Sequence, residues 1–211
     1  MEYFSLYTLI IIVVAYFAGT FPSAYLVTKL FTKQNILDSG TGNAGAMNTY
    51  EVTGSRYAGI LVFLLDALKG VAAVWFAIWL TGNNFLGASI AAVWVILGHN
   101  YNMFQNYRGG RGLAAATGAI AAINPLGVIL WLIMWFTGYY IIKKDVHVAN
   151  AIACLGAPVL VFSAPDEIIY AMQIMSFADT MDYKILCAVI CLIILIRHIE
   201  PLKAIFKEKE S

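Results

Sequence analysis

The feature that most constrains the fold of this chain is a series of apolar segments, most of them as long as a lipid bilayer is thick. A helix that crosses the hydrocarbon core needs about 20 apolar residues. The segments lie at 5–31, 57–81, 84–104, 113–142, 147–164 and 183–199. Only 12% of the residues are charged, whereas about 25% is usual in a soluble domain. We therefore expect an all-α integral membrane protein with one domain over 1–211, and we exclude a disordered chain, a nucleic-acid-binding protein and a typical cytosolic enzyme.

The segment at 113–142 is too long for one straight helix, and it contains Asn124-Pro125. The residue before a proline avoids the helical region. We therefore expect a short helix at 113–123 and a full one at 125–143, which gives seven helices. At 1.5 Å per residue the short helix spans about 16 Å, so it is expected to cross the membrane incompletely.

The positions of lysine and arginine test this division, because these residues mark cytoplasmic loops. With seven helices and the N-terminus outside, every basic loop falls on the cytoplasmic side: 28–56, 105–112, 143–144 and the C-terminal tail. The acidic segment 165–182 then falls outside. Six helices would invert the last three of these assignments, so seven is the number that the charges favour.

Two polar cytoplasmic loops, 32–56 and 105–112, are rich in glycine and are the expected place of the chemistry. The first formally matches GxGxxG, but membrane-length segments flank it instead of a strand–loop–helix unit, so a dinucleotide fold is rejected. Glycines still let backbone N–H groups converge on an anion. The candidate residues here are Gly40, Thr41, Gly42, Asn43, Gly45 and Asn48. A flexible loop of small residues is the alternative.

The second loop places two arginines among three glycines just before a helix start. Arginine binds phosphate with two hydrogen bonds, and a helix N-terminus adds positive potential. The candidate phosphate-binding residues are Arg108, Gly109, Gly110, Arg111 and Gly112, and His99 lies nine residues before Arg108. The alternative is an ordinary basic loop of the cytoplasmic side.

Asp66 and Lys69 lie inside an apolar segment and share a helix face at i, i+3 spacing. Charges within a membrane cost a few kcal/mol each and usually serve function. Two roles are open: an internal pair that braces the site, or a direct ligand of a substrate phosphate. Transport is the competing class, but no inverted repeat is visible in the sequence.

These motifs resemble those of the bacterial acyl-phosphate-dependent glycerol-3-phosphate acyltransferases, the PlsY family, over nearly the whole chain. Residues 42–48 resemble the family's SGNIGATN, residues 66–70 its DxxKG, and residues 98–112 its GHxFPxFxxFKGGKG. Further matches are 19–26, Asn124-Pro125 and Arg197-His198. The resemblance implies seven transmembrane helices in the bacterial plasma (inner) membrane, with an active site that faces the cytoplasm.

The resemblance also implies the reaction: transfer of an acyl group from acyl-phosphate to the 1-hydroxyl of glycerol 3-phosphate, giving lysophosphatidic acid and phosphate. From the resemblance, His99, Thr41 and Asn48 are the candidate catalytic residues. His99 is the candidate general base, with the donor's own phosphate as the rival base. Lys69 joins the phosphate-binding residues of the two loops, and the supporting residues are Asp66, Asn124, Arg197 and His198. No metal, cofactor or nucleic acid is implied; the partners are the two substrates, membrane lipid and other enzymes of phospholipid synthesis.

The chain departs from the family pattern at several positions. The family's first-loop serine falls on Thr41 and its following arginine on Glu51, which reverses the charge. Near the end, Ile199 and Pro201 replace a family arginine and asparagine, and Glu208 or Glu210 corresponds to its terminal glutamate. These departures keep two alternatives open: a related acyltransferase with another phosphorylated acceptor, and a non-catalytic lipid-phosphate-binding protein or transporter of the same fold.

Overall fold

The structure is a computed structural model that describes residues 2–207, so Glu208 and Glu210 lie outside the described residues. The chain divides into two compact units, 1–122 and 123–211, which are described one at a time. All regular elements in the described residues are helices. The expectation of one domain over the whole chain stays a prediction.

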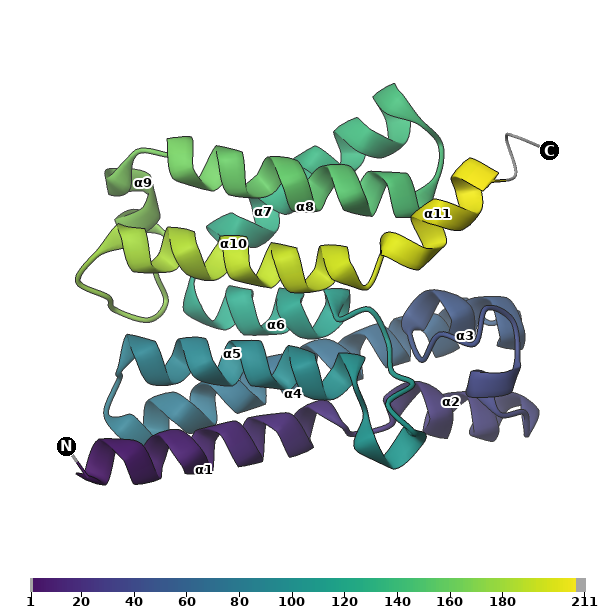
Figure 1. Ribbon diagram of the computed structural model, residues 1–211, viewed down its shortest axis with the longest axis horizontal. Helices are drawn as coiled ribbons and strands as arrows, with labels where there is room; N and C mark the ends of the chain where they lie inside the picture. Colours follow the sequence, from purple (N-terminus) through teal and green to yellow (C-terminus); the bar gives the residue numbers. More distant parts are fainter. Residues whose placement is uncertain (1, 208–211) are drawn as a thin grey trace. The chain divides into compact units, whose positions relative to one another are not determined.

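The first unit is built around three helices that lie side by side, α1 (Glu2–Gly19), α4 (Arg56–Thr81) and α5 (Phe85–Asn100) (Figure 1). The shorter helices α2 (Ser23–Thr32) and α3 (Ala46–Thr53) pack together against α4. The remaining elements are η1 (Ile36–Asp38), η2 (Met103–Gln105) and α6 (Leu113–Ile123), of which all but the last residue belongs to this unit. These elements bring both predicted loops to the same end of α4 and α5.

Glycines set the close approach of these helices. A Cβ added at Gly98 on α5 would collide with the backbone carbonyl of Tyr16 on α1. In the same way, a Cβ at Gly118 on α6 would collide with the carbonyl of Ala67 on α4. Any larger residue would push the backbones apart, so these glycines determine how closely α5 approaches α1 and how closely α6 approaches α4.

The first apolar segment is interrupted where α1 ends at Gly19 and α2 begins at Ser23. The three residues between them include Pro22, which has no N–H to continue the helical hydrogen bonding. The backbone carbonyls that this break exposes become available to side chains of neighbouring helices.

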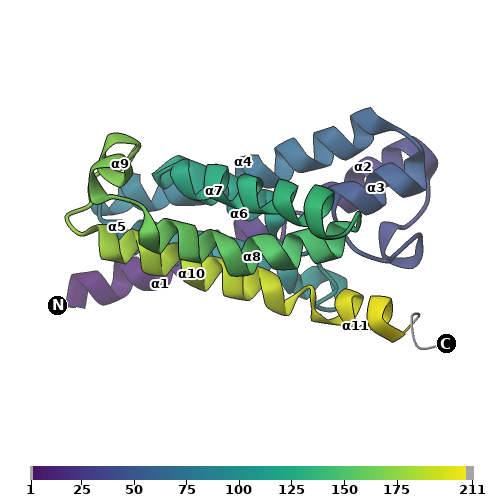
Figure 2. The ribbon, with the colours of Figure 1, turned by 90° about the horizontal axis from the view of Figure 1, so that it is seen from above.

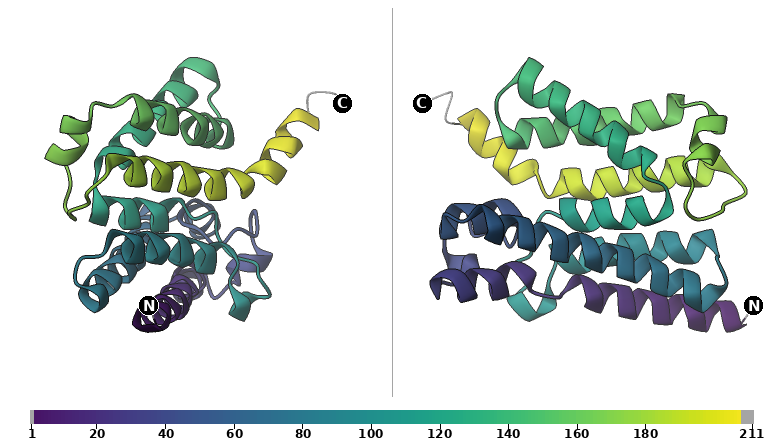
Figure 3. Two further views of the ribbon diagram at one scale, coloured as in Figure 1. Left: turned by 60° about the vertical axis from the view of Figure 1, so that its left-hand side comes forward. Right: turned by 180° about the vertical axis from the view of Figure 1, so that it is seen from behind.

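The second unit contains α7 (Leu126–Phe136), α8 (Val146–Ser163) and α10 (Thr180–Ile196), with α8 packed against both α7 and α10 (Figures 2 and 3). The π-helical segment η3 (Thr137–Ile142) continues α7. The short helix α9 (Asp166–Ala171) and α11 (Ile199–Lys207) complete the unit.

The predicted break at Asn124-Pro125 is confirmed, because α6 ends at Ile123 and α7 begins at Leu126. The Asn124 side chain stabilises the break. Its carbonyl oxygen accepts a hydrogen bond from the Leu126 N–H at 2.9 Å, and its amide donates to the Ile169 carbonyl at 2.8 Å.

Within residues 2–207, three helical segments are long and apolar enough to cross a membrane: Leu6–Thr32, Arg56–Thr81 and Val146–Ser163. A fourth is added if α10 and the start of α11, which bend by 50°, count as one span. Helices α5, α6 and α7 are apolar but shorter. Large apolar side chains such as Trp79, Leu64 and Leu68 of α4 are exposed, as expected of surfaces that face lipid. Seven crossings and their orientation stay predictions.

Candidate active site

A buried cluster of three ionisable side chains lies between α4 and α5. Asp66 and Lys69 face the same side of α4, and the Lys69 Nζ lies 2.9 Å from the Asp66 Oδ1. His99 enters from the last turn of α5, and its Nδ1 lies 2.9 Å from the Lys69 Nζ. All three residues are at most 8% exposed. A charged pair that is buried this deeply needs a hydrogen-bond or charge partner for each of its polar groups. Asp66 and His99 are two such partners for the Lys69 ammonium.

Residues around the helix break complete these partners. The Ser23 hydroxyl, in the first turn of α2, donates a hydrogen bond to the Asp66 Oδ1. The Lys69 Nζ also donates to the Phe21 carbonyl at 3.4 Å. Nearby, the Asn102 amide donates to the Thr20 carbonyl at 2.7 Å. Because the helix is interrupted between α1 and α2, the backbone carbonyls of Thr20 and Phe21 accept hydrogen bonds from polar side chains of the site.

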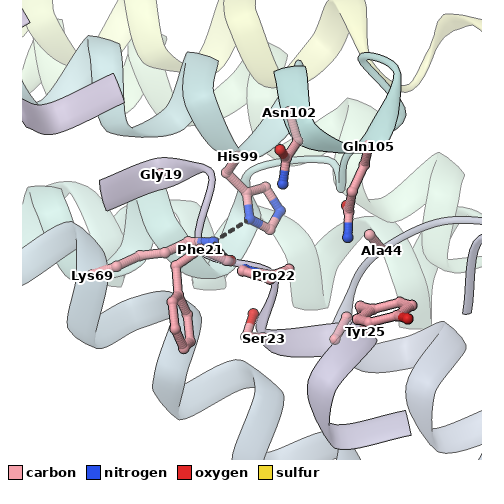
Figure 4. A pocket seen from close by; sticks show the side chains of 11 residues that line it. Gly19, Phe21, Pro22, Ser23, Tyr25, Ala44, Lys69, His99, Asn102 and Gln105 are labelled. Carbon is pink, nitrogen blue, oxygen red and sulfur yellow. Dashed lines mark hydrogen bonds between the residues drawn. The ribbon is translucent and has the colours of Figure 1, made fainter. Parts of the chain in front are cut away.

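The cluster opens on a small cavity (Figure 4). Lys69 and His99 are the two predicted site residues whose side chains line it. Its other lining residues are Gly19, Phe21, Pro22, Ser23, Ala24, Tyr25, Ala44, Asn102 and Gln105. An ammonium, an imidazole, a hydroxyl and two amides therefore converge from α2, α4 and α5 and from the segment that follows α5, which suits a small anionic or hydroxylated substrate.

The first glycine loop is held in shape by Asn48. Its side-chain amide donates to the carbonyls of Asn43 at 2.9 Å and Ser39 at 3.1 Å, and its Oδ1 accepts from the Thr41 N–H at 2.9 Å. Gly42 adopts a left-handed φ of 69°, a conformation that glycine tolerates best. Thr41 is exposed and does not line the cavity. The catalytic roles of Thr41 and Asn48 stay predictions, and the contacts show Asn48 ordering the loop.

The second glycine loop folds back on His99. The Gly110 N–H donates to the His99 carbonyl at 3.1 Å, and a Cβ at Gly110 would collide with the His99 Nε2. Arg111, half-buried, follows, and Gly112 has a φ of 82° immediately before α6. Only glycine at position 110 leaves room for the imidazole, so this loop is shaped around the histidine.

Arg108 connects the two loops. Its guanidinium lies 3.3 Å from the Asp38 Oδ1 and also donates to the Leu37 carbonyl. Both charged side chains are more than half exposed. Arg108 is therefore placed at the rim of the loop pair, where it retains surface that a phosphate can reach.

Three predicted supporting residues belong to the second unit. Asn124 stabilises the break before α7, as described above. His198 is fully buried, with its Nε2 2.9 Å from the Asn150 amide and its Nδ1 2.8 Å from the Ile194 carbonyl. Arg197 is half-buried at the end of α10. A supporting role of these residues at the site stays a prediction.

Three residues that line the cavity, Ser23, Asn102 and Gln105, are not among the site residues predicted from the sequence. Ser23 had a usable signal, because Pro22-Ser23 interrupts an otherwise apolar segment and polar residues within a membrane helix usually have a specific partner. Asn102 and Gln105 follow α5 in a polar loop, where their side chains carry no distinguishing pattern. Within residues 2–207, no group of three or more His, Cys, Asp or Glu side chains is placed to hold a metal ion.

Apolar helices around a buried carboxylate–ammonium–imidazole cluster define a membrane-embedded enzyme with a polar site at its helix ends. The family model described as Glycerol-3-phosphate acyltransferase matches residues 9–208, and the chain belongs to this family. The resemblance noted in the sequence is thereby confirmed, and with it the assignment to acyltransferases.

Relatives and solved structures agree with this assignment. The glycerol-3-phosphate acyltransferases of Staphylococcus aureus strains JH9 and Newman are each 30% identical over 209 residues, covering 96% of both chains. The crystal structure of PlsY (YgiH), an integral membrane glycerol 3-phosphate acyltransferase, in its glycerol 3-phosphate form has a TM-score of 0.76 at 25% identity, covering 95% of this chain and 92% of that one. The crystal structure of its lysophosphatidic acid form has a TM-score of 0.75 at 26% identity, with the same coverage. The chain is thus an all-α integral membrane protein.

Proposed function

We propose that this protein transfers an acyl group from acyl-phosphate to the 1-hydroxyl of glycerol 3-phosphate, giving lysophosphatidic acid and phosphate. The observation that carries the proposal is the cavity that Lys69 and His99 line, with Ala44 of the first glycine loop in its wall and Gly110 of the second packed on His99. Family membership supports the reaction class, and the similar crystal structures are named for the acceptor and product forms.

The chemistry requires two phosphate groups to lie close together. Lys69, Arg108 and Arg111 supply positive charge that offsets their repulsion, and backbone N–H groups of the glycine loops add further donors. An acyl-phosphate is a mixed anhydride, so phosphate leaves readily. The acyl carbon–oxygen bond to phosphate breaks, a bond to the glycerol oxygen forms, and the hydroxyl proton ends on the released phosphate.

We infer that transfer is direct, without an acyl group on the enzyme. Thr41 is exposed and does not line the cavity. Ser23 lines it, and the Asp66 carboxylate that accepts its hydroxyl hydrogen is paired with the Lys69 ammonium, which makes that carboxylate a weak base for activating the hydroxyl. Direct transfer needs the two substrates bound together, and holding them in position supplies much of the rate.

We also propose a topology with seven membrane-crossing helices, the N-terminus outside, the C-terminus in the cytoplasm and the site facing the cytoplasm of a bacterial inner membrane. The distribution of basic residues supports it. Single cysteines placed at positions 83 and 203 in a cysteine-free background, treated with an impermeant thiol reagent on intact cells, test it. Labelling at 83 and protection at 203 are expected; the reverse pattern would refute the orientation.

The activity is tested with the purified protein in lipid, acyl-phosphate and labelled glycerol 3-phosphate. We expect lysophosphatidic acid, with the rate reduced at least a hundredfold in His99→Ala and Arg111→Ala. Lys203→Ala, which removes an exposed charge on α11, should keep the wild-type rate. Acyl transfer to a different phosphorylated alcohol only would identify the alternative acceptor that Glu51 and Pro201 leave open, and no transfer from a folded protein would refute the enzyme assignment.

A further inference from the structure

The contact between Lys69 and His99 determines which nitrogen of the imidazole carries its proton. A lysine ammonium has three hydrogens to donate and no lone pair to accept with. Three acceptors surround the Lys69 Nζ: the Asp66 Oδ1 at 2.9 Å, the His99 Nδ1 at 2.9 Å and the Phe21 carbonyl at 3.4 Å. This set matches the needs of an ammonium group.

The charge distribution of the cluster supports the same assignment. Lysine is much more basic than imidazole. Burial disfavours the charged form of Lys69, and the Asp66 carboxylate in direct contact opposes that effect. Asp66 does not compete for the imidazole, because its Oδ1 lies 3.7 Å from the His99 Nδ1, too far for a good hydrogen bond. The Nδ1 of His99 is therefore the acceptor, and its lone pair is used by Lys69.

The proton of a neutral His99 must then reside on Nε2. Figure 4 shows the ring with one nitrogen bonded to Lys69 and the other directed away from it. The Nε2 edge packs on Gly110, where any added Cβ would collide with it, and the Ala44 carbonyl lies on the same side. The Nε2–H group therefore lies at the junction of both glycine loops.

We propose that His99 is a neutral hydrogen-bond donor in this site, and that its Nε2–H stabilises the oxygen that becomes negative on the acyl carbon during transfer. Lys69 is the positioning residue that holds the required tautomer. This inference rests on the proposed acyl transfer and assigns His99 the opposite role to the general base expected from the sequence. An Nε2 that already carries a proton cannot accept the hydroxyl proton, which instead passes to an oxygen of the departing phosphate, so the step balances without a further co-reactant.

The tautomer is measured directly by nitrogen NMR on protein labelled with [15N]histidine in lipid. The chain has three histidines, and the signals missing in His99→Gln identify those of His99. We expect a protonated Nε2 and an unprotonated Nδ1 at the pH where transfer is measured. A proton on Nδ1, or on both nitrogens, would overturn the proposal.

Kinetics separate a donor from a base, because a glutamine amide can donate a hydrogen bond but cannot accept a proton. We expect His99→Gln to stay within about tenfold of the wild-type rate, while His99→Ala falls about 10²–10³-fold, the usual cost of losing one donor to an oxyanion. Equal losses in both variants would refute the donor role.

Lys69 is tested by its own pair of variants. Lys69→Met should let the His99 proton distribute between both nitrogens in the NMR spectrum, and Lys69→Arg should restore the single tautomer. An unchanged tautomer in Lys69→Met would contradict the positioning role. A wild-type protein that transfers no acyl group would remove both the oxyanion role and the proposed function, whereas the NMR result alone decides the tautomer, so the two failures are distinguishable.

Discussion

The Asp66 carboxylate and the Lys69 ammonium lie 2.9 Å apart, three residues apart along α4 and almost fully shielded from solvent. The sequence left two roles open for this pair, a brace for the site or a phosphate ligand. The contacts show the bracing arrangement, because Lys69 is bonded to Asp66 and His99, and they also place Lys69 in the cavity wall. Its role as a phosphate ligand stays a prediction.

This pair leads to a prediction about stability. Lys69→Met leaves the Asp66 charge buried with the Ser23 hydroxyl as a remaining partner, and we expect a loss of about 3–5 kcal/mol, as is usual when one member of a buried pair is removed. The double variant Asp66→Asn/Lys69→Met removes both charges and should recover most of this loss. Unfolding in detergent measures both; a double variant less stable than the single one would contradict the argument.

Gly110 is predicted to be essential for activity. In Gly110→Ala the new Cβ meets the His99 Nε2, so the imidazole must move and transfer should fall by at least a hundredfold. Gly82→Ala is the control, because Gly82 has a left-handed φ of 67° with open space around it. That variant should lose about 1–2 kcal/mol of stability with an unchanged rate per folded molecule. Normal activity in Gly110→Ala would contradict the close packing of Gly110 on the His99 imidazole.

Asn48 is predicted to order the first glycine loop. Asn48→Ala removes the hydrogen bonds to the partly buried backbone groups of Asn43, Ser39 and Thr41, at a cost of about 1–3 kcal/mol. We expect faster amide hydrogen exchange across residues 39–45 and a higher KM for the phosphorylated substrates. Asn48→Asp keeps the acceptor for the Thr41 N–H but loses the two N–H donors, so amide hydrogen exchange across residues 39–45 should be nearly as fast as in Asn48→Ala. Unchanged exchange in both variants would show that other contacts hold the loop.

Arg108 and Arg111 are predicted to differ. Arg108 is more than half exposed and paired with Asp38, and exposed pairs contribute at most about 1 kcal/mol. Arg108→Ala should therefore raise the KM for acyl-phosphate by about tenfold or less, with an effect that shrinks at high salt. Arg111 is half-buried beside Gly110. Arg111→Ala should therefore impair the reaction more than Arg108→Ala does, at every salt concentration. A larger loss in Arg108→Ala would reverse this ranking.

Asp166 in the second unit gives a prediction for pH. Hydrogen bonds from Lys184 and then Thr180 lower the pKa of this carboxyl. Its contribution to stability is therefore fully present above the ordinary aspartate pKa of about 3.9 and is lost as pH falls through the lower pKa of the folded state. The difference in Tm between wild type and Asp166→Asn should shrink across this acid range. A difference in Tm that grows on acidification would contradict the predicted direction of this pH dependence.

Part of the architecture follows from local features of the sequence alone. The break at Asn124-Pro125 was predicted because the conformational restriction before a proline is local. The sharing of one helix face by Asp66 and Lys69 follows from three-residue spacing alone. The composition of the two loops predicts where anions bind, since glycine and arginine supply that chemistry in any fold, and this binding stays a prediction.

Other features needed the packed structure. The Lys69–His99 contact joins residues 30 positions apart on different helices, and the Ser23–Asp66 hydrogen bond spans 43. No local pattern predicts such pairs, because they depend on how closely α1, α4 and α5 approach at their glycines. The same contact carries the role proposed for His99. The sequence fits a proton acceptor and a hydrogen-bond donor equally well, and the Lys69 ammonium against the His99 Nδ1 is the observation that favours the donor.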